Sequence, residues 1–139
     1  MFEKILVPLD GSEHSIRALK NAIQIAKKFD GSITLIHVYT VSPFVITPTQ
    51  VYKYVQAIQE LGNSILEEGK NLVKAEGVQV KTLLKEGHTV EKILETVTKE
   101  NINLVVLGSR GLSKLKGILM GSVSEGVTKN APCPVLVVK

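Results

Sequence analysis

The hydrophobic and polar positions along this chain change their period repeatedly, and each change predicts a new element. Short apolar runs such as 5–9 and 104–107 carry no charge, which is typical of strands covered on both faces of a sheet. Between such runs, apolar residues recur at three- and four-residue steps, as on one face of a helix. The predicted strands are 4–9, 32–38, 78–84, 103–107 and 135–138, and helices are predicted at 12–30, 51–76, around 90–97 and at 122–130.

Capping and turn residues predict where these elements end. Ser12 is the expected N-cap of the first helix, and Gly31 is expected to supply a positive φ at its end. The connection 39–50 contains two prolines and is predicted to be non-helical. Ser122 opens the sequence Ser-Val-Ser-Glu, which has the form of a capping box and predicts the start of the last helix.

The alternation of strands and helices predicts an α/β fold. Strands joined by helices pair in parallel through right-handed crossovers, and the helices cover both faces of the sheet. The length of 139 residues suits one domain, 1–139, and no linker or repeat divides it. The sequence therefore predicts a single-domain, open, parallel sheet of five strands.

Composition argues against several classes of protein. The net charge is only +4, and aromatic residues make up 4% with no tryptophan, so nucleic-acid binding is not expected. No apolar run approaches the ~20 residues of a membrane span, and the N-terminus lacks the pattern of a secretory signal. Cys133 is the only cysteine and cannot form an internal disulfide. We expect a protein of the reducing cytoplasm that does not interact with membranes.

Two loops at the carboxyl edge of the predicted sheet contain the residues suited to chemistry, and ligands of open α/β sheets bind at this edge. One loop, 8–12, contains Asp10. The other, 108–121, contains four glycines and leads into the last helix. Glycines let backbone amides approach an anion, and a helix start adds free N–H groups, so this loop predicts phosphate binding. The nearby cations are Arg110, Lys114 and Lys116.

Each of these candidates has an alternative role that the sequence leaves open. The glycines of 108–121 could only shape turns, and the Ser122 hydroxyl could only cap its own helix. Asp10 could hold a ribose hydroxyl, a base or a metal, or it could simply shape the turn. Glu125 would repel a phosphate unless a cation such as Mg²⁺ lies between them. The Walker and G-x-G-x-x-G patterns are absent.

The sequence resembles the universal stress protein family along its whole length. The spacing Gly108-x2-Gly111-x9-Gly121-Ser122 is similar to the signature of the ATP-binding subgroup of that family. Other segments that resemble their counterparts in the family are 5–12, 36–38, 104–111 and 133–138.

This resemblance implies a Rossmann-like fold of the adenine nucleotide alpha-hydrolase type, with strand order 3-2-1-4-5. It also implies that ATP, ADP or AMP binds here, with Mg²⁺ or Mn²⁺ on the phosphates and no metal site formed by the protein itself. By similarity, the base and ribose would contact Pro8, Asp10 and Val38. The phosphates would contact Gly108, Gly111, Gly121, Ser122 and Val123 of the glycine loop 108–123, with Arg110 beside them.

The resemblance further implies a homodimer built through the last strand, Val135–Val138, whose apolar edge would otherwise invite uncontrolled pairing. A nucleotide-dependent regulatory or stress-response role is the first functional hypothesis. A slow ATPase is the alternative, and it needs a base and a positioned water. Asp10, His37 and Glu125 are the nearby candidates for that base, although His37 is expected to be a packed, hydrogen-bonded residue.

Overall fold

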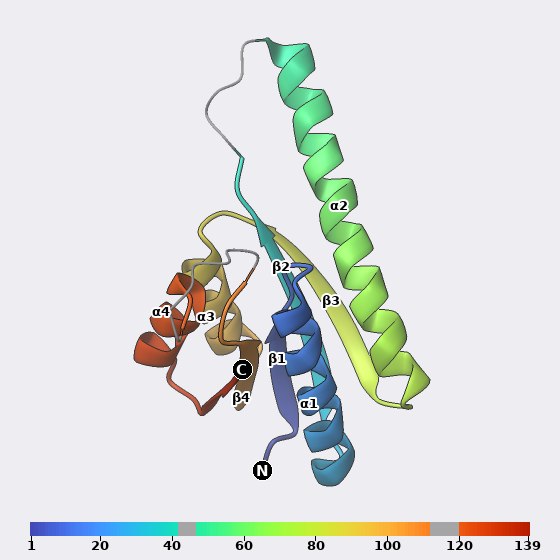
Figure 1. The fold of residues 1–139 in the computed structure, drawn as a ribbon, viewed down its shortest axis with the longest axis vertical. Coiled ribbons are helices and arrows are strands. Elements are labelled where there is room, and N and C mark those ends of the chain that lie inside the picture. Colours follow the sequence, from blue (N-terminus) through green and yellow to red (C-terminus); the bar gives the residue numbers. More distant parts are fainter. Residues whose placement is uncertain (42–46, 112–119) are drawn as a thin grey trace.

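The computed structural model describes residues 1–41, 47–111 and 120–139, and it confirms the predicted alternation of strands and helices (Figure 1). The strands are β1 (Lys4–Pro8), β2 (Ser32–Tyr39), β3 (Gln79–Glu86), β4 (Leu104–Gly108) and β5 (Val135–Val138). The helices are α1 (Glu13–Phe29), α2 (Pro48–Ala75), α3 (Thr89–Lys99) and α4 (Ser122–Asn130). Every predicted element is present, with ends that shift by a few residues.

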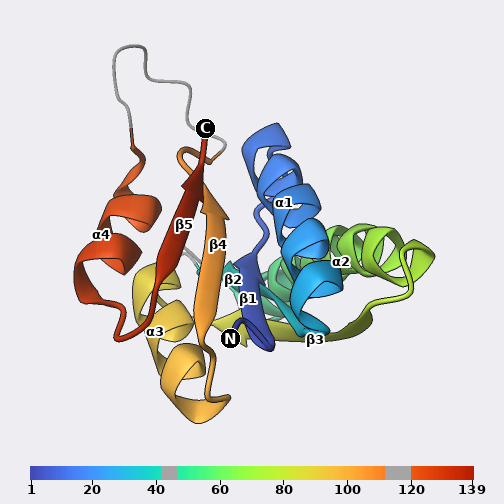
Figure 2. The same cartoon turned by 90° about the horizontal axis from the view of Figure 1, so that it is seen from below.

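The five strands form one parallel sheet in the order β3-β2-β1-β4-β5, which the resemblance implied. The direction of winding reverses at β1, which pairs with β2 on one side and with β4 on the other. α1 and α2 cover one face of the sheet, and α3 and α4 cover the other (Figure 2). The carboxyl ends of β1 and β4 are therefore neighbours at the reversal, where ligands of open α/β sheets bind.

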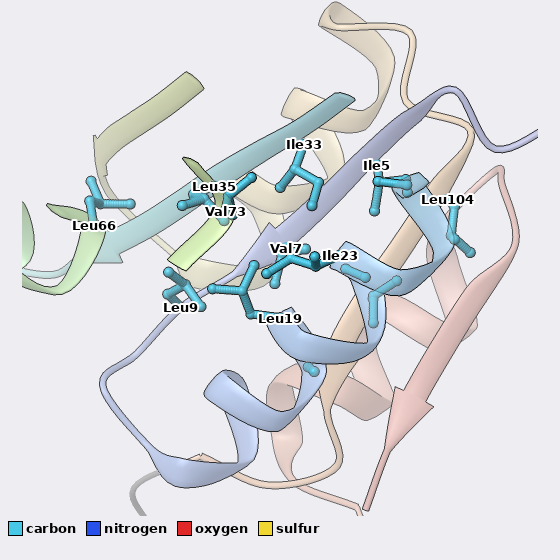
Figure 3. Packing of buried hydrophobic residues seen from close by; sticks show 14 residues of the cluster. Ile5, Val7, Leu9, Leu19, Ile23, Ile33, Leu35, Leu66, Val73 and Leu104 are labelled. Carbon is cyan, nitrogen blue, oxygen red and sulfur yellow. The ribbon is translucent and has the colours of Figure 1, made fainter. Parts of the chain in front are cut away.

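Each face of the sheet carries its own apolar core, because successive residues of a strand point to opposite faces. Val7 and Leu35 belong to the core under α1 and α2, together with Leu19 and Val73 (Figure 3). The core under α3 and α4 joins Leu6, Ile36, Ile93, Val105 and Val127. This burial on both faces explains why the central strands are continuous apolar runs.

The two ends of α1 give one confirmed prediction and one error. Ser12 caps the helix, because its Oγ accepts a hydrogen bond of 3.1 Å from Ser15 N–H. At the other end, the left-handed residue is Asp30, with a φ of 52°, and the prediction of a positive φ at Gly31 is wrong. Gly31 has a different reason to be glycine, since a Cβ there would lie 2.6 Å from the Phe2 carbonyl oxygen.

α2 begins earlier than the sequence predicted. Thr47 is its N-cap and accepts a hydrogen bond of 3.2 Å from Gln50 N–H, and Pro48 is its first residue. A proline is well tolerated in the first turn of a helix, because an N–H at that position has no helical partner. The non-helical prediction for 39–50 is therefore wrong at its last three residues, while 42–46 lie outside the described residues.

Candidate functional site

A crevice opens between β1 and β4 because the two strands stop pairing before either one ends. The last paired residues of the two strands are Leu6 of β1 and Val105 of β4. Alternate residues of β1 turn their backbone groups toward β4, as the 2.9 Å bond from Asn103 N–H to the Lys4 carbonyl shows. Pro8, two residues after Leu6, also turns its backbone groups toward β4, but a proline has no N–H to donate. The ladder therefore cannot continue past Pro8 in its regular form.

A cavity of about 300 Å³ lies in this crevice. It brings together every residue that the resemblance assigned to a nucleotide site, namely Pro8, Asp10, Val38, Gly108, Arg110, Gly111, Gly121, Ser122 and Val123. The lining also includes residues that the sequence did not single out, namely Leu9, Ser15, Ile36, Thr89, Ile93, Leu107 and Ser124. Of these residues, Ser15, Thr89 and Ile93 belong to no motif, and the topology alone reveals that α3 reaches the cavity.

Asp10 connects the two loops that the sequence singled out. Its Oδ1 accepts a hydrogen bond of 2.9 Å from Ser12 N–H, so the carboxylate shapes the turn before α1. Its Oδ2 lies against Gly111 of the opposite loop, so close that a Cβ on residue 111 would clash with it. The turn-shaping role of Asp10 is therefore observed, and its second carboxylate oxygen is directed across the crevice.

The start of α4 differs from the predicted capping box. The N-cap is Gly121, the helix begins at Ser122, and no side chain caps it. Ser124 is the serine engaged at this end, because its hydroxyl donates to the Ser109 carbonyl at 2.8 Å. Gly121 N–H donates to the same carbonyl, so the start of α4 is tied to the end of β4. The Ser122 hydroxyl therefore does not cap the helix, and the alternative in which Ser122 only caps its own helix is wrong.

Free backbone donors gather where α4 meets the cavity. The first amides of a helix have no intrahelical partner, and the bond from Glu125 N–H to the Gly121 carbonyl, at 3.0 Å, closes the first turn. Ser122, Val123 and Ser124 carry the preceding amides, and all three line the cavity. The positive end of the helix dipole adds to this arrangement, which suits an anion. Arg110 also lines the cavity, whereas Lys114 and Lys116 lie outside the described residues.

At the other end of the cavity, β2 extends past the end of β1. The last register pair between these strands is Pro8 with Ile36. Ile36 faces β1, since its carbonyl accepts a bond of 2.8 Å from Leu9 N–H, and Val38 faces the same side two residues later. No backbone hydrogen bond joins Val38 to the turn that follows β1, a segment described in full. The N–H and C=O of Val38 are therefore turned toward the space that β1 leaves.

Of the three candidate bases for hydrolysis, Asp10 is the one that lines the cavity. Glu125 forms an exposed ion pair of 2.9 Å with Lys129 on the outer side of α4. His37 lies under α2, on the opposite face of the sheet, where its Nδ1 bonds to the Leu9 carbonyl at 2.7 Å. The expectation of a packed, hydrogen-bonded His37 is confirmed.

The remaining chemical candidates contribute little. Burial raises the pKa of the Cys133 thiol, so the thiol is predominantly protonated at neutral pH and is a poor nucleophile. Within 1–41, 47–111 and 120–139, no group of three His, Cys, Asp or Glu side chains could hold a metal ion. No helix in these ranges is long and apolar enough to span a membrane.

Fold and cavity together define an open, parallel α/β protein with a ligand site at the reversal of its strand order. The sequence model of the universal stress protein family matches residues 1–139. The chain therefore belongs to the universal stress protein family, as the sequence resemblance indicated.

Individual relatives agree with this assignment. Universal stress protein MJ0531 of Methanocaldococcus jannaschii is 41% identical over 141 residues, which cover 100% of this chain and 83% of the relative. A solved universal stress protein in complex with cAMP is 28% identical with a TM-score of 0.72, covering 99% of this chain and 96% of that chain. A family member of Arabidopsis thaliana with AMP bound is 25% identical with a TM-score of 0.71, covering 99% and 91%.

Proposed function

We propose that this protein binds an adenine nucleotide, with ATP as its main ligand, in the cavity between β1 and β4, and that it acts as a regulatory module in the stress response. One observation carries the proposal: a single cavity joins a cluster of helix-start amides to an open peptide edge at Val38. Two related proteins have structures with cAMP and AMP, both adenine nucleotides. The same two ligands support the choice of adenine over other bases.

The Val38 end suits the adenine base. Its peptide group offers one donor and one acceptor side by side, which matches the N1 acceptor and the N6 amino donor of adenine. Guanine presents a carbonyl oxygen where adenine presents the amino group. That oxygen would face the Val38 carbonyl oxygen, and two acceptors cannot form a hydrogen bond. Apolar side chains of Ile36, Ile93 and Leu107 line the same cavity and can contact the faces of the ring.

The α4 end suits the phosphates. Gly121 leaves room for the anion, and the amides of Ser122 and Val123 donate to it. Arg110 adds positive charge from the loop that follows β4, and Asp10 is placed to bind the ribose between the two ends. A Mg²⁺ or Mn²⁺ ion would be held mainly by the phosphates, because the described residues provide no cluster of metal ligands.

Isothermal titration calorimetry on nucleotide-stripped protein tests the proposal. We expect saturable binding of ATP, and binding of GTP at least about tenfold weaker, because a mismatched polar edge leaves buried groups unpaired. ADP and AMP titrated in parallel measure the contribution of each phosphate. Absence of saturation by all three adenine nucleotides at millimolar concentration would overturn the proposal.

In our proposal, residues 1–139 act as one domain that works in the cytoplasm. The single sheet supports the first part, because it joins the first strand and the last within one hydrogen-bonded layer. The single cysteine, Cys133, supports the second part, because it fits a reducing compartment.

We also propose that two copies of the chain pair through β5. This strand lies at the edge of the sheet, and Leu136 is 38% exposed there. Two identical apolar edges can pair antiparallel around a two-fold axis, which removes an exposed edge from each copy.

Replacing Leu136 by lysine is expected to shift the protein from dimer to monomer. Near the two-fold axis the two introduced charges would face each other across the paired strands, and like charges in this position are destabilising. Size-exclusion chromatography with light scattering measures the mass directly. The control is Leu61→Lys, because Leu61 is also apolar and 63% exposed but lies on α2. A monomeric wild type, or a dimer that survives Leu136→Lys, would contradict the proposed interface.

A further inference from the structure

Leu9, the residue that links β1 to Asp10, is held by β2 at both of its backbone groups. Its N–H donates to the Ile36 carbonyl at 2.8 Å. Its carbonyl accepts a hydrogen bond of 2.7 Å from His37 Nδ1. Because a carbonyl can only accept, Nδ1 is the protonated nitrogen in this bond.

A regular parallel ladder would place a different donor on the Leu9 carbonyl. In such a ladder, one residue pairs with two residues of the neighbouring strand that lie two positions apart. Its N–H donates to the carbonyl of the first, and its carbonyl accepts from the N–H of the second. Since Ile36 accepts from Leu9, the next bond would run from Val38 N–H to the Leu9 carbonyl. That bond is not formed, and the imidazole of His37 takes its place. Val38 therefore keeps an open N–H beside the cavity.

We propose that His37 is a positioning residue, whose imidazole occupies the Leu9 carbonyl and thereby keeps the Val38 peptide group open for the ligand. The inference rests on the proposed nucleotide function and names the residue that prepares the base end of the site. His37 itself is not among the residues that line the cavity. It acts from the opposite face of the sheet, through the backbone of Leu9 and Val38.

α2 provides the space that this imidazole needs. Gly62 is buried where the helix crosses the ring, and a Cβ there would lie 2.8 Å from His37 Cδ2 and 2.7 Å from Leu84 Cδ1. Any larger residue would force the imidazole or Leu84 to move. The helix therefore confines the ring to the place where Nδ1 reaches the Leu9 carbonyl.

Amide hydrogen exchange of Val38 in the nucleotide-free protein tests this inference without any ligand. In the wild type we expect rapid exchange, because the amide has no partner on that side of β2. In His37→Ala the Leu9 carbonyl is released, so we expect Val38 N–H to bond to it and to exchange at least about tenfold more slowly. A purely structural role for His37 predicts the opposite, since a looser protein exchanges faster. A Val38 amide that is already protected in the wild type would overturn the inference.

Two amide substitutions at position 37 test the effect on binding. The side-chain N–H₂ of asparagine can occupy the place of Nδ1, whereas that of glutamine lies nearer the place of Nε2. We therefore expect His37→Asn to bind ATP within about threefold of the wild type, and His37→Gln to bind about tenfold more weakly. Thermal unfolding of both variants monitors the fold. Equal affinities for the Asn and Gln variants would overturn the positioning role.

The two measurements separate this inference from the function on which it rests. If the wild type binds no adenine nucleotide, the proposed function fails, and Val38 exchange alone decides the role of His37. If the wild type binds ATP but His37→Ala leaves both affinity and Val38 exchange unchanged, the function survives and the positioning role fails.

Discussion

Replacing Gly121 by valine is expected to abolish ATP binding and to leave the fold intact. Gly121 has φ and ψ of −77° and 169°, an extended conformation that any residue adopts. Among the described residues, a Cβ there would meet nothing closer than 3.5 Å, so the backbone accepts a side chain. That Cβ would lie beside the backbone of Ser109 and Arg110, and 3.9 Å from Gly111 N. The two methyl groups of valine would then fill the space where the phosphates are proposed to lie. Calorimetry should show an affinity lowered by at least about 100-fold.

Two further variants make this experiment specific. Gly121→Ala adds a single carbon at a tolerated distance and should weaken ATP binding by an intermediate amount. Thr128→Val places the same side-chain shape on an exposed position of α4, outside the cavity, and should leave binding unchanged. Circular dichroism and thermal unfolding verify the fold of each variant. Unchanged affinity in a folded Gly121→Val protein would show that the phosphates do not lie against the glycine loop.

Much of the fold could be predicted from the sequence because local signals and tertiary structure agree there. The apolar runs of β1 and β4 are strands buried on both faces, and their burial on both sides is what makes them continuously apolar. Ser12 caps α1 because its hydroxyl needs only an amide three residues away. The strand order came from family resemblance, since periodicity does not state which strands are neighbours.

Two of the errors arise where a distant segment determines the local structure. Gly31 was expected to provide a left-handed turn, but it is glycine because the Phe2 carbonyl packs against it. The capping box is not formed, and the start of α4 is instead tied to the end of β4, because the Gly121 N–H and the Ser124 hydroxyl both donate to the Ser109 carbonyl. Neither Phe2 nor Ser109 is near its partner in the sequence, so no local pattern could have indicated these contacts.

The candidate site was predictable in its motifs but not in its geometry. Glycines and Asp10 stand out in the sequence, whereas Thr89 and Ile93 enter the cavity only because α3 crosses behind the sheet. The open peptide edge at Val38 depends on where β1 stops relative to β2, and on which donor reaches the Leu9 carbonyl. These are properties of two strands together, so a single segment cannot reveal them.

The close packing of α2 links the stability of the fold to this geometry. Its buried residues are Gly62, Leu66, Gly69 and Val73, which recur at helical spacing along one stripe. Gly62 lies over His37, and Gly69 lies over Leu9, the two residues joined by the imidazole–carbonyl bond. The two glycines thus let α2 approach the sheet where β2 holds the turn that carries Asp10.

Replacing Gly69 by valine is therefore expected to lower the free energy of unfolding by about 2–3 kcal/mol, although glycine is a poor helix former. A Cβ at this position would lie 2.5 Å from Leu9 Cδ1 and 3.1 Å from Leu35 Cδ1, so the added carbons must push the helix away from a filled core. Urea denaturation measures the change.

The matched control is Ala57→Val, on an exposed part of the same helix, where valine brings only its propensity cost of roughly 0.5 kcal/mol. If Gly69→Val proved as stable as the wild type or more so, the higher helix propensity of valine would outweigh the cost of its packing. The helix α2 would then not be closely packed against Leu9. If the packing account holds, the folded fraction of Gly69→Val should also bind ATP more weakly than Ala57→Val, because displacement of Leu9 moves both Asp10 and the carbonyl that His37 holds.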